Sequence, residues 1–165
     1  MNAHSIPGTL LLLALTIPAG GAGKGAASGT FKYDDKTYTV VDAVAWNEAP
    51  FKLSDGTEIR WVKAVLSDKP FDTAAMGKDG RYDDSDLMAH PSATLTITIN
   101  AANGEFDGIR MRDDKGSGAD FRCEGPGLLT VTKNDATTIG GRFKCMEHNV
   151  TFEAPILKAP KPPAP

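Results

Sequence analysis

Residues 92–156 read SATLTITINAANGEFDGIRMRDDKGSGADFRCEGPGLLTVTKNDATTIGGRFKCMEHNVTFEAPI. In the first part of this stretch Leu95, Ile97 and Ile99 alternate with threonines, which is the period of a strand that buries one face. The alternation returns several times, separated by turn residues about every ten positions. The stretch therefore predicts an antiparallel all-β unit of six strands, at 95–101, 105–112, 119–124, 128–133, 137–145 and 150–156.

The two cysteines lie in two of these predicted strands. Cys123 shares one side of its strand with Phe121, and Cys145 shares one side with Phe143, so both sulfurs are expected to point inward. We expect a disulfide between them, contributing about 3 kcal/mol through the entropy of the closed loop. The alternatives are two buried free thiols or a metal pair. The metal is disfavoured because His148 is the one further ligand close by, and zinc needs three or four.

The residues before this unit add further strands. Runs at 30–33 and 37–46 flank a turn, and 58–66 follows a predicted loop at 47–56 that contains Pro50 and an Asp-Gly turn. The runs at 37–46 and 58–66 are apolar on both sides, which indicates strands covered on both faces. Together the chain predicts an antiparallel sandwich of about nine strands, with a partly closed meander barrel as the alternative.

Between the two groups of strands lies a segment of a different kind. Residues 71–77 could form one or two helical turns, whereas 78–90 is polar, rich in aspartate and without a period. We interpret 70–91 as one short helical or irregular excursion. Connections of this length tend to be functional or disordered, so the excursion is a candidate functional loop.

The two ends of the chain have their own composition. Residues 9–17, TLLLLALTI, are apolar but too short to span a bilayer, and small residues follow them. We predict a signal peptide and small-residue linker at 1–27, cleaved near Ala22 or Ala27, then a single domain at 28–157 and a Pro-rich extended tail at 158–165. The mature chain would have no transmembrane span and would be periplasmic or secreted. An uncleaved N-terminal anchor is the alternative, because no Lys or Arg precedes the apolar run.

Charge excludes one class of partner and suggests another. The net charge of the 165 residues is −3, which argues against a nucleic-acid binder. If the strands at 105–112, 119–124 and 137–145 were neighbours, five cations would share one outward face and form a candidate anion-binding surface: Arg110, Arg112, Arg122, Arg142 and Lys144. The alternative is that these are ordinary solvated strand charges, paired with nearby acids.

Candidates for metal binding and catalysis are few. Asp79, Asp83, Asp84 and Asp86 are weak metal candidates, because they lack the glycine and the distal glutamate of a calcium loop. His90 and His148 are isolated in the sequence, and no serine lies in a nucleophile elbow. We expect no cofactor and favour a non-catalytic role.

Three segments resemble uncharacterised secreted bacterial proteins of a β-rich type: GTFKYDDKTYTVVDAVAW (29–46), VKAVLSDKPFD (62–72) and the LTITIN…GEFDGI hairpin (95–109). The resemblance implies export and a β-rich fold but no activity.

The sequence thus favours an exported, non-catalytic binding module of the bacterial envelope or medium. Its expected partner is an unknown protein or an anionic envelope component. The alternatives are an envelope-targeted inhibitor of a hydrolase, with 70–91 as the inserted element, and a hydrolase of unknown type. The placement of 70–91 distinguishes them, because it could project as a wedge, line a cleft with His90, or pack flat.

Overall fold

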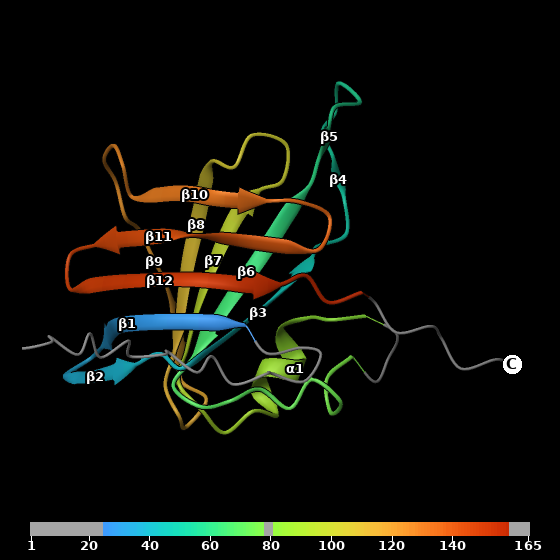
Figure 1. The fold of residues 1–165 in the computed structure, drawn as a ribbon. Helices are drawn as coiled ribbons and strands as arrows, with labels where there is room; N and C mark the ends of the chain where they lie inside the picture. Colours follow the sequence, from blue (N-terminus) through green and yellow to red (C-terminus); the bar gives the residue numbers. More distant parts are fainter. Residues whose placement is uncertain (1–24, 78–80, 159–165) are drawn as a thin grey trace, which may run out of the picture.

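The computed structural model describes residues 25–77 and 81–158, and most of them form antiparallel strands (Figure 1). Two five-stranded sheets pack face to face, and the strands of one run across those of the other. The predicted all-β sandwich is therefore confirmed, and the sheets do not close into a barrel.

Each sheet combines strands from distant parts of the chain. We call sheet A the sheet with the order β10-β11-β12-β1-β2, formed by β1 (Ala26–Tyr33), β2 (Lys36–Thr39), β10 (Leu129–Asn134), β11 (Thr138–Cys145) and β12 (His148–Pro155). We call sheet B the sheet with the order β3-β6-β7-β8-β9, formed by β3 (Asp42–Asn47), β6 (Trp61–Ser67), β7 (Thr94–Asn100), β8 (Phe106–Arg112) and β9 (Gly118–Phe121).

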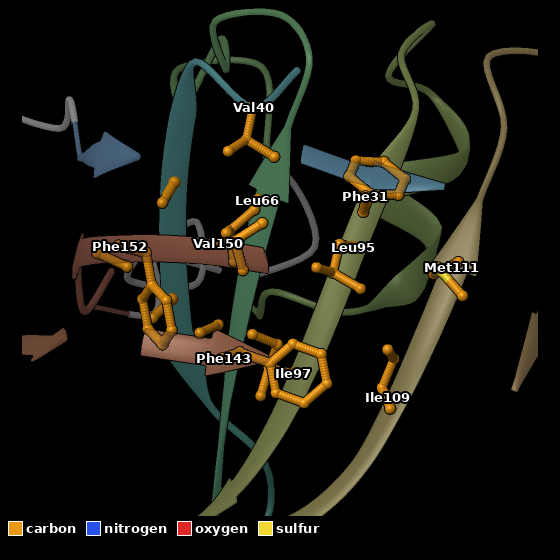
Figure 2. Close-up of a cluster of buried hydrophobic side chains, with 14 of the residues drawn as sticks. Phe31, Val40, Leu66, Leu95, Ile97, Ile109, Met111, Phe143, Val150 and Phe152 are labelled. Atoms are coloured by element: carbon orange, nitrogen blue, oxygen red, sulfur yellow. The ribbon is translucent and has the colours of Figure 1, made fainter. Parts of the chain in front are cut away.

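The main core lies between the two sheets (Figure 2). Leu95 and Ile97 of β7 are fully buried there, as their alternation with threonine predicted, and they face Phe143 and Val150 from sheet A. Burying each such side chain contributes about 1.5–3 kcal/mol. The inward side chains of both sheets thus make one continuous apolar layer.

The run at 37–46 is two strands rather than one. It leaves sheet A after β2, passes through Val40 and the exposed Val41, and enters sheet B as β3. In β3, alternate residues serve two different cores. Ala43 and Ala45 face sheet A, whereas Val44 and Trp46 join a second apolar cluster on the outer face of sheet B. The prediction that this run is covered on both faces is confirmed for β3.

The six strands predicted after residue 92 are present, but they divide between the sheets. β7–β9 belong to sheet B and β10–β12 to sheet A, so the chain crosses the sandwich between Phe121 and Leu129. Cys123 lies in this crossing, just beyond β9, rather than in a strand. It forms a disulfide with Cys145 of β11 over a Cα–Cα distance of 6.2 Å. The predicted bridge is present, and it joins the crossing segment to sheet A.

We call the segment between β6 and β7, residues 68–93, the excursion. Its described parts, 68–77 and 81–93, fold back over the outer face of sheet B. Its helix α1 (Asp84–Met88) begins at a capping box. The Asp83 carboxylate accepts the backbone N–H of Asp86, and the Asp86 carboxylate accepts the backbone N–H of Asp83. The helical turns predicted at 71–77 do not form a helix. Instead, Phe71, Met76 and Leu87 pack on the apolar patch around Val44 and Val65. The excursion therefore packs flat.

The segment between β3 and β6, residues 48–60, does the opposite, and we call it the ribbon. It contains β4 (Phe51–Lys52) and β5 (Glu58–Ile59), which pair only with each other among the described strands. The ribbon prolongs the β3–β6 hairpin, because the Glu48 N–H donates to the Trp61 carbonyl at 3.0 Å. Figure 1 shows it rising beyond the two sheets. The loop predicted at 47–56 therefore contains a strand, β4.

The ends of the chain are described only in part. β1 begins at Ala26, so the folded domain includes two residues that were assigned to the predicted linker. Cleavage near Ala22 would leave β1 intact, whereas cleavage after Ala27 would remove two of its residues. The rest of the predicted signal peptide, 1–24, and the tail beyond Lys158 lie outside the described residues. In the part of the chain that the structure describes, no helix is long and apolar enough to cross a membrane.

Candidate functional site

The five cations predicted to share a face are divided between the two sheets. Arg110 and Arg112 lie on β8 of sheet B, whereas Arg142 and Lys144 lie on β11 of sheet A. Arg122 lies in the crossing between the sheets. The predicted single anion-binding face is therefore wrong. The error arose because strands 105–112 and 137–145 are not neighbours: the chain changes sheets after β9.

The two arginines of β8 are themselves unsuited to receive an anionic surface. Arg110 lies near two carboxylates, Asp84 at 3.4 Å and Asp120 at 3.8 Å. Arg112 is only 6% exposed, and its Nη1 has no hydrogen-bond partner among the described residues. The positive charge on this side of sheet B is thus either balanced or withdrawn from solvent.

The aspartates considered for metal binding have structural partners instead. Asp83 caps α1, where hydrogen bonds from the Ser85 hydroxyl and N–H lower the pKa of its carboxyl below the ordinary value. Asp86 accepts N–H groups from Gly77 and Asp83, and Asp84 forms an ion pair with Lys63 at 3.0 Å. Asp79 lies outside the described residues. Within 25–77 and 81–158, no three His, Cys, Asp or Glu side chains gather closely enough to hold a metal ion.

Lys63 connects sheet B to both neighbouring segments. Its ammonium lies 3.1 Å from Glu48, at the base of the ribbon, and 3.0 Å from Asp84 in the excursion. Burial lowers the pKa of Lys63, but hydrogen bonds to these two carboxylates outweigh it and raise the pKa above its ordinary value. This network fixes the positions of both segments rather than offering a free charge.

His90 lies close to a serine, which is the arrangement that would favour an enzyme. Its Nε2 is 3.4 Å from the Ser67 hydroxyl, and its ring stacks on Phe71 at 4.8 Å between centroids. However, Ser67 is fully buried, and its hydroxyl donates to Ser92 at 2.9 Å. A substrate cannot reach this hydroxyl, so the cluster anchors the excursion instead of forming a reactive centre.

His148 also has a structural position. It is buried at the start of β12, and its Nδ1 accepts the Lys32 N–H at 3.2 Å. Burial lowers its pKa, with Glu147 opposing the shift. The acceptor role at Nδ1 requires the neutral ring, which agrees with the lowered pKa.

The ribbon is the most exposed part of the described domain. Ten consecutive residues, 49–58, are all exposed, and Phe51 and Leu53 among them are 52% and 40% accessible. Cross-strand pairing of Phe51 with Ile59 places the large apolar side chains on one side of the ribbon, while Lys52 and Glu58 take the other. The ribbon thus presents an amphipathic surface outside the sandwich.

The apolar side of the ribbon continues to its base. The Phe51 ring lies 6.1 Å from that of Trp61, the first residue of β6. On the polar side, Arg60 donates to Glu58 at 2.6 Å. These contacts hold the base and the middle of the ribbon, and they leave Phe51 and Leu53 exposed. Exposed aromatic and aliphatic side chains on a projecting element are typical of a protein-docking site.

A hollow of about 530 Å³ lies at the base of the ribbon. It is bordered on one side by β5, through residues 57–60, and on the other by the start of the β7–β8 turn, through 100–102. The Ala101 N–H donates to the Arg60 carbonyl at 2.9 Å and closes the inner end of the hollow. The ribbon and this hollow together form the candidate binding site.

A second hollow, of about 510 Å³, lies between the end of β3 and the excursion. Trp46 and Tyr82 line it with rings 6.4 Å apart, but Trp46 is almost fully buried and its indole N–H already donates to Glu48 at 3.0 Å. Its aromatic groups therefore contribute to packing.

Sequence reasoning missed the ribbon, although a signal was present. An Asp-Gly turn at Asp55 and Gly56 separates two short alternating runs, FKL at 51–53 and TEI at 57–59. This is a hairpin pattern. The pattern is short, because each run has only three residues and Pro50 precedes the first.

Comparison of the chain with protein-family models, with curated proteins and with solved structures found no match. The candidate function therefore depends on the chain's own geometry.

Proposed function

We propose that this protein is an exported, non-catalytic module that binds a partner protein through the ribbon. The observation that supports the proposal most directly is the uninterrupted exposure of residues 49–58, including Phe51 and Leu53. A two-stranded ribbon is at best marginally stable in water on its own. Covering its apolar side with a partner would bury that surface and hold the ribbon in place.

Two features support export. The apolar run at 9–17 has the length of a signal-peptide core. The Cys123–Cys145 bridge is the form that cysteines take in oxidising compartments such as the periplasm or the medium.

The ribbon also bears on the alternatives. An inhibitor of a hydrolase needs a narrow projecting element. The ribbon has that shape, whereas the described part of the 70–91 segment packs flat. Inhibition is therefore the second candidate. An anionic envelope component has less support, because the five cations do not share a face. A hydrolase has the least support, because the hydroxyl of Ser67, near His90, is buried.

Replacing the ribbon tests the proposal. Residues 49–60 are exchanged for an Asn-Gly turn that joins β3 directly to β6. The immobilised wild type should retain a partner from the proteins that the source cell exports, and the ribbonless variant should lose it while keeping its circular dichroism spectrum. The retained protein is identified by mass spectrometry, purified, and its binding measured by calorimetry.

Met88→Ser is the matched control, because Met88 is 71% exposed but lies on the excursion. It should retain the same partner with unchanged affinity. Equal retention by the ribbonless variant, or a wild type that retains nothing, would contradict the proposal.

A further inference from the structure

The outer edge of β5 carries backbone groups that point away from the ribbon. The Leu53 N–H donates to the Thr57 carbonyl at 2.8 Å. Hydrogen-bonded and non-hydrogen-bonded pairs alternate along an antiparallel ladder. Phe51 and Ile59 therefore direct their backbone N–H and C=O groups toward each other, whereas Lys52 and Glu58 direct theirs away from the ribbon. In the described part of the chain no strand lies beside this edge of β5, so the N–H and C=O of Glu58 are available to another strand.

The hollow provides the space that such a strand would need. The hydrogen bond from the Ala101 N–H to the Arg60 carbonyl lies on the same edge. Arg60 is the next residue after Glu58 whose backbone groups point outward. The hydrogen bond shows that this edge already accepts backbone pairing where β7 ends. Beyond Arg60 the hollow of about 530 Å³ opens beside Glu58, with Ile59 half-buried at its wall.

The two edges of the ribbon are not equivalent. On β4 the backbone N–H and C=O that point away from the ribbon belong to Lys52. Pro50, the residue before β4, has no N–H to donate. A proline on an exposed edge is a common protection against strand addition. The edge of β5 has no proline and borders the hollow. Pairing is therefore favoured on the β5 side.

Charge indicates which kind of strand would fit. The residues that line the hollow carry one carboxylate, Glu58, and one guanidinium. Asp55, Glu105 and Asp107 add carboxylates within five residues of this lining along the chain. That guanidinium, Arg60, is already bonded to Glu58. Hydrogen bonds from Thr57 lower the pKa of the Asp55 carboxyl, which keeps it ionised. The surroundings of the hollow are thus acidic, and they complement a basic segment.

We propose that a basic, extended segment of a partner protein adds to β5 as a further strand within this hollow, with its apolar side chains against Phe51, Leu53 and Ile59. An extended polypeptide is the ligand whose N–H and C=O groups match an open strand edge, and pockets beside the edge select alternate side chains. This inference rests on the proposed function and specifies the chemistry of the partner segment that contacts the ribbon.

The test uses two prolines at the two members of one cross-strand pair. Glu58→Pro removes the outward N–H on the β5 edge, and Lys52→Pro removes the outward N–H on the β4 edge. Neither removes the bond between Leu53 and Thr57. Binding of a fluorescein-labelled peptide, KVTVKVTVK, is measured by fluorescence anisotropy, and the acidic peptide EVTVEVTVE is the probe of charge preference.

The wild type should bind the basic peptide saturably and the acidic one at least about tenfold more weakly. Glu58→Pro should weaken binding of the basic peptide by about tenfold, because it removes one backbone hydrogen bond to the peptide and disturbs the adjacent ones. Lys52→Pro should weaken it by less than about twofold. Glu58→Thr separates charge from backbone and should have an effect between the two.

Three outcomes would overturn the inference: no saturable binding of the basic peptide, equal binding by Glu58→Pro and the wild type, or equal losses in both proline variants. Sedimentation equilibrium tests a second copy as the occupant: a wild-type dimer that Glu58→Pro converts to a monomer would also overturn it. If the peptide test of strand addition fails while the ribbonless variant still loses its partner, the proposed function stands without this inference. If the ribbonless variant also retains its partner, both the inference and the proposed function are wrong.

Discussion

The ribbon and the excursion leave sheet B from opposite ends of the same strand, β6, and they meet opposite environments. The excursion returns over the outer face of sheet B and buries Phe71, Met76 and Leu87 against Val44 and Val65. The ribbon extends past the end of β7 and finds no surface to pack on. Both segments contain apolar residues, so composition does not distinguish them. Whether an insertion contributes to stability or to binding depends on the surface within its reach.

The comparison reverses the expectation that a long connection is the functional one. The excursion is the longer of the two, yet it serves as the cover of a second core. Its polar groups are also engaged, since Asp42 of β3 accepts the Phe71 N–H and Lys63 pairs with Asp84. The shorter ribbon retains the exposed apolar surface to which the proposed function assigns binding.

Two leucines provide the sharpest test of this contrast. Leu87 is buried in the excursion, and Leu53 is exposed on the ribbon. Leu87→Ala should lower the free energy of unfolding by about 3 kcal/mol, because it leaves a cavity against sheet B. Leu53→Ala should change it by less than about 0.5 kcal/mol. Urea unfolding followed by tryptophan fluorescence measures both, and similar losses in the two variants would break the comparison.

Two aspartates test the hydrogen bonds of the same segments. Asp42 is buried and accepts the N–H groups of Ala43 and Phe71, each at 2.9 Å. Asp42→Ala should cost about 2 kcal/mol, because it leaves these donors without a partner inside the protein. Asp55→Ala, at the exposed turn of the ribbon, should leave the unfolding midpoint in urea unchanged. A stable Asp42→Ala protein would show that the excursion is not held by this contact.

The smallest expected effect is one of pH. Burial lowers the pKa of His90 below 6.5, with Asp68 opposing the shift, so the unfolded chain takes up the proton at a higher pH than the folded one. The contribution of the neutral ring is complete above pH 6.5 and is lost as the pH falls toward the folded pKa. Unfolding measured at pH 7.5 and at pH 5.5 should show a decline that is smaller in His90→Gln.

This pH effect separates the two segments as well. The ribbon contains no histidine, so binding of a partner to it should be the same at these two pH values. Asp42, Asp68, Lys69 and Asp72 are the charged groups that act on the imidazole of His90. An equal decline in wild type and His90→Gln would assign the pH dependence to another group, with His148 as the next candidate.

Much of the fold could be predicted because alternation indicates which side chains face the core between the sheets. The run from Thr94 to Asn100 became β7, with its isoleucines in the core. The same alternation could not tell which sheet a strand joins, because strands of sheets A and B have the same pattern. The turn at 125–127 looked like a hairpin connection, but it lies where the chain crosses the sandwich. That one unpredicted crossing divided the supposed cationic face.

The candidate site was harder to predict than the fold. Phe51 and Leu53 were visible as apolar residues, but their exposure follows from the end of β7 at Asn100, which leaves the ribbon without a neighbour. Conversely, Phe71 and Leu87 show no period, because the excursion is irregular and buries them one by one. Local sequence patterns detect helices and strands. They show neither which residues of an irregular segment are buried nor whether a strand is left exposed.

The sequence by itself determined most strands of the two sheets and the inward side of most of them, because the period of two is a local property of the chain. It also indicated the pairing of Cys123 with Cys145, because the chain has two cysteines. Only the tertiary structure decided which strands are neighbours, which insertion is covered and which projects. Those properties depend on contacts between residues far apart in the sequence. The ribbon became the candidate binding surface because the strand beside it stops at Asn100.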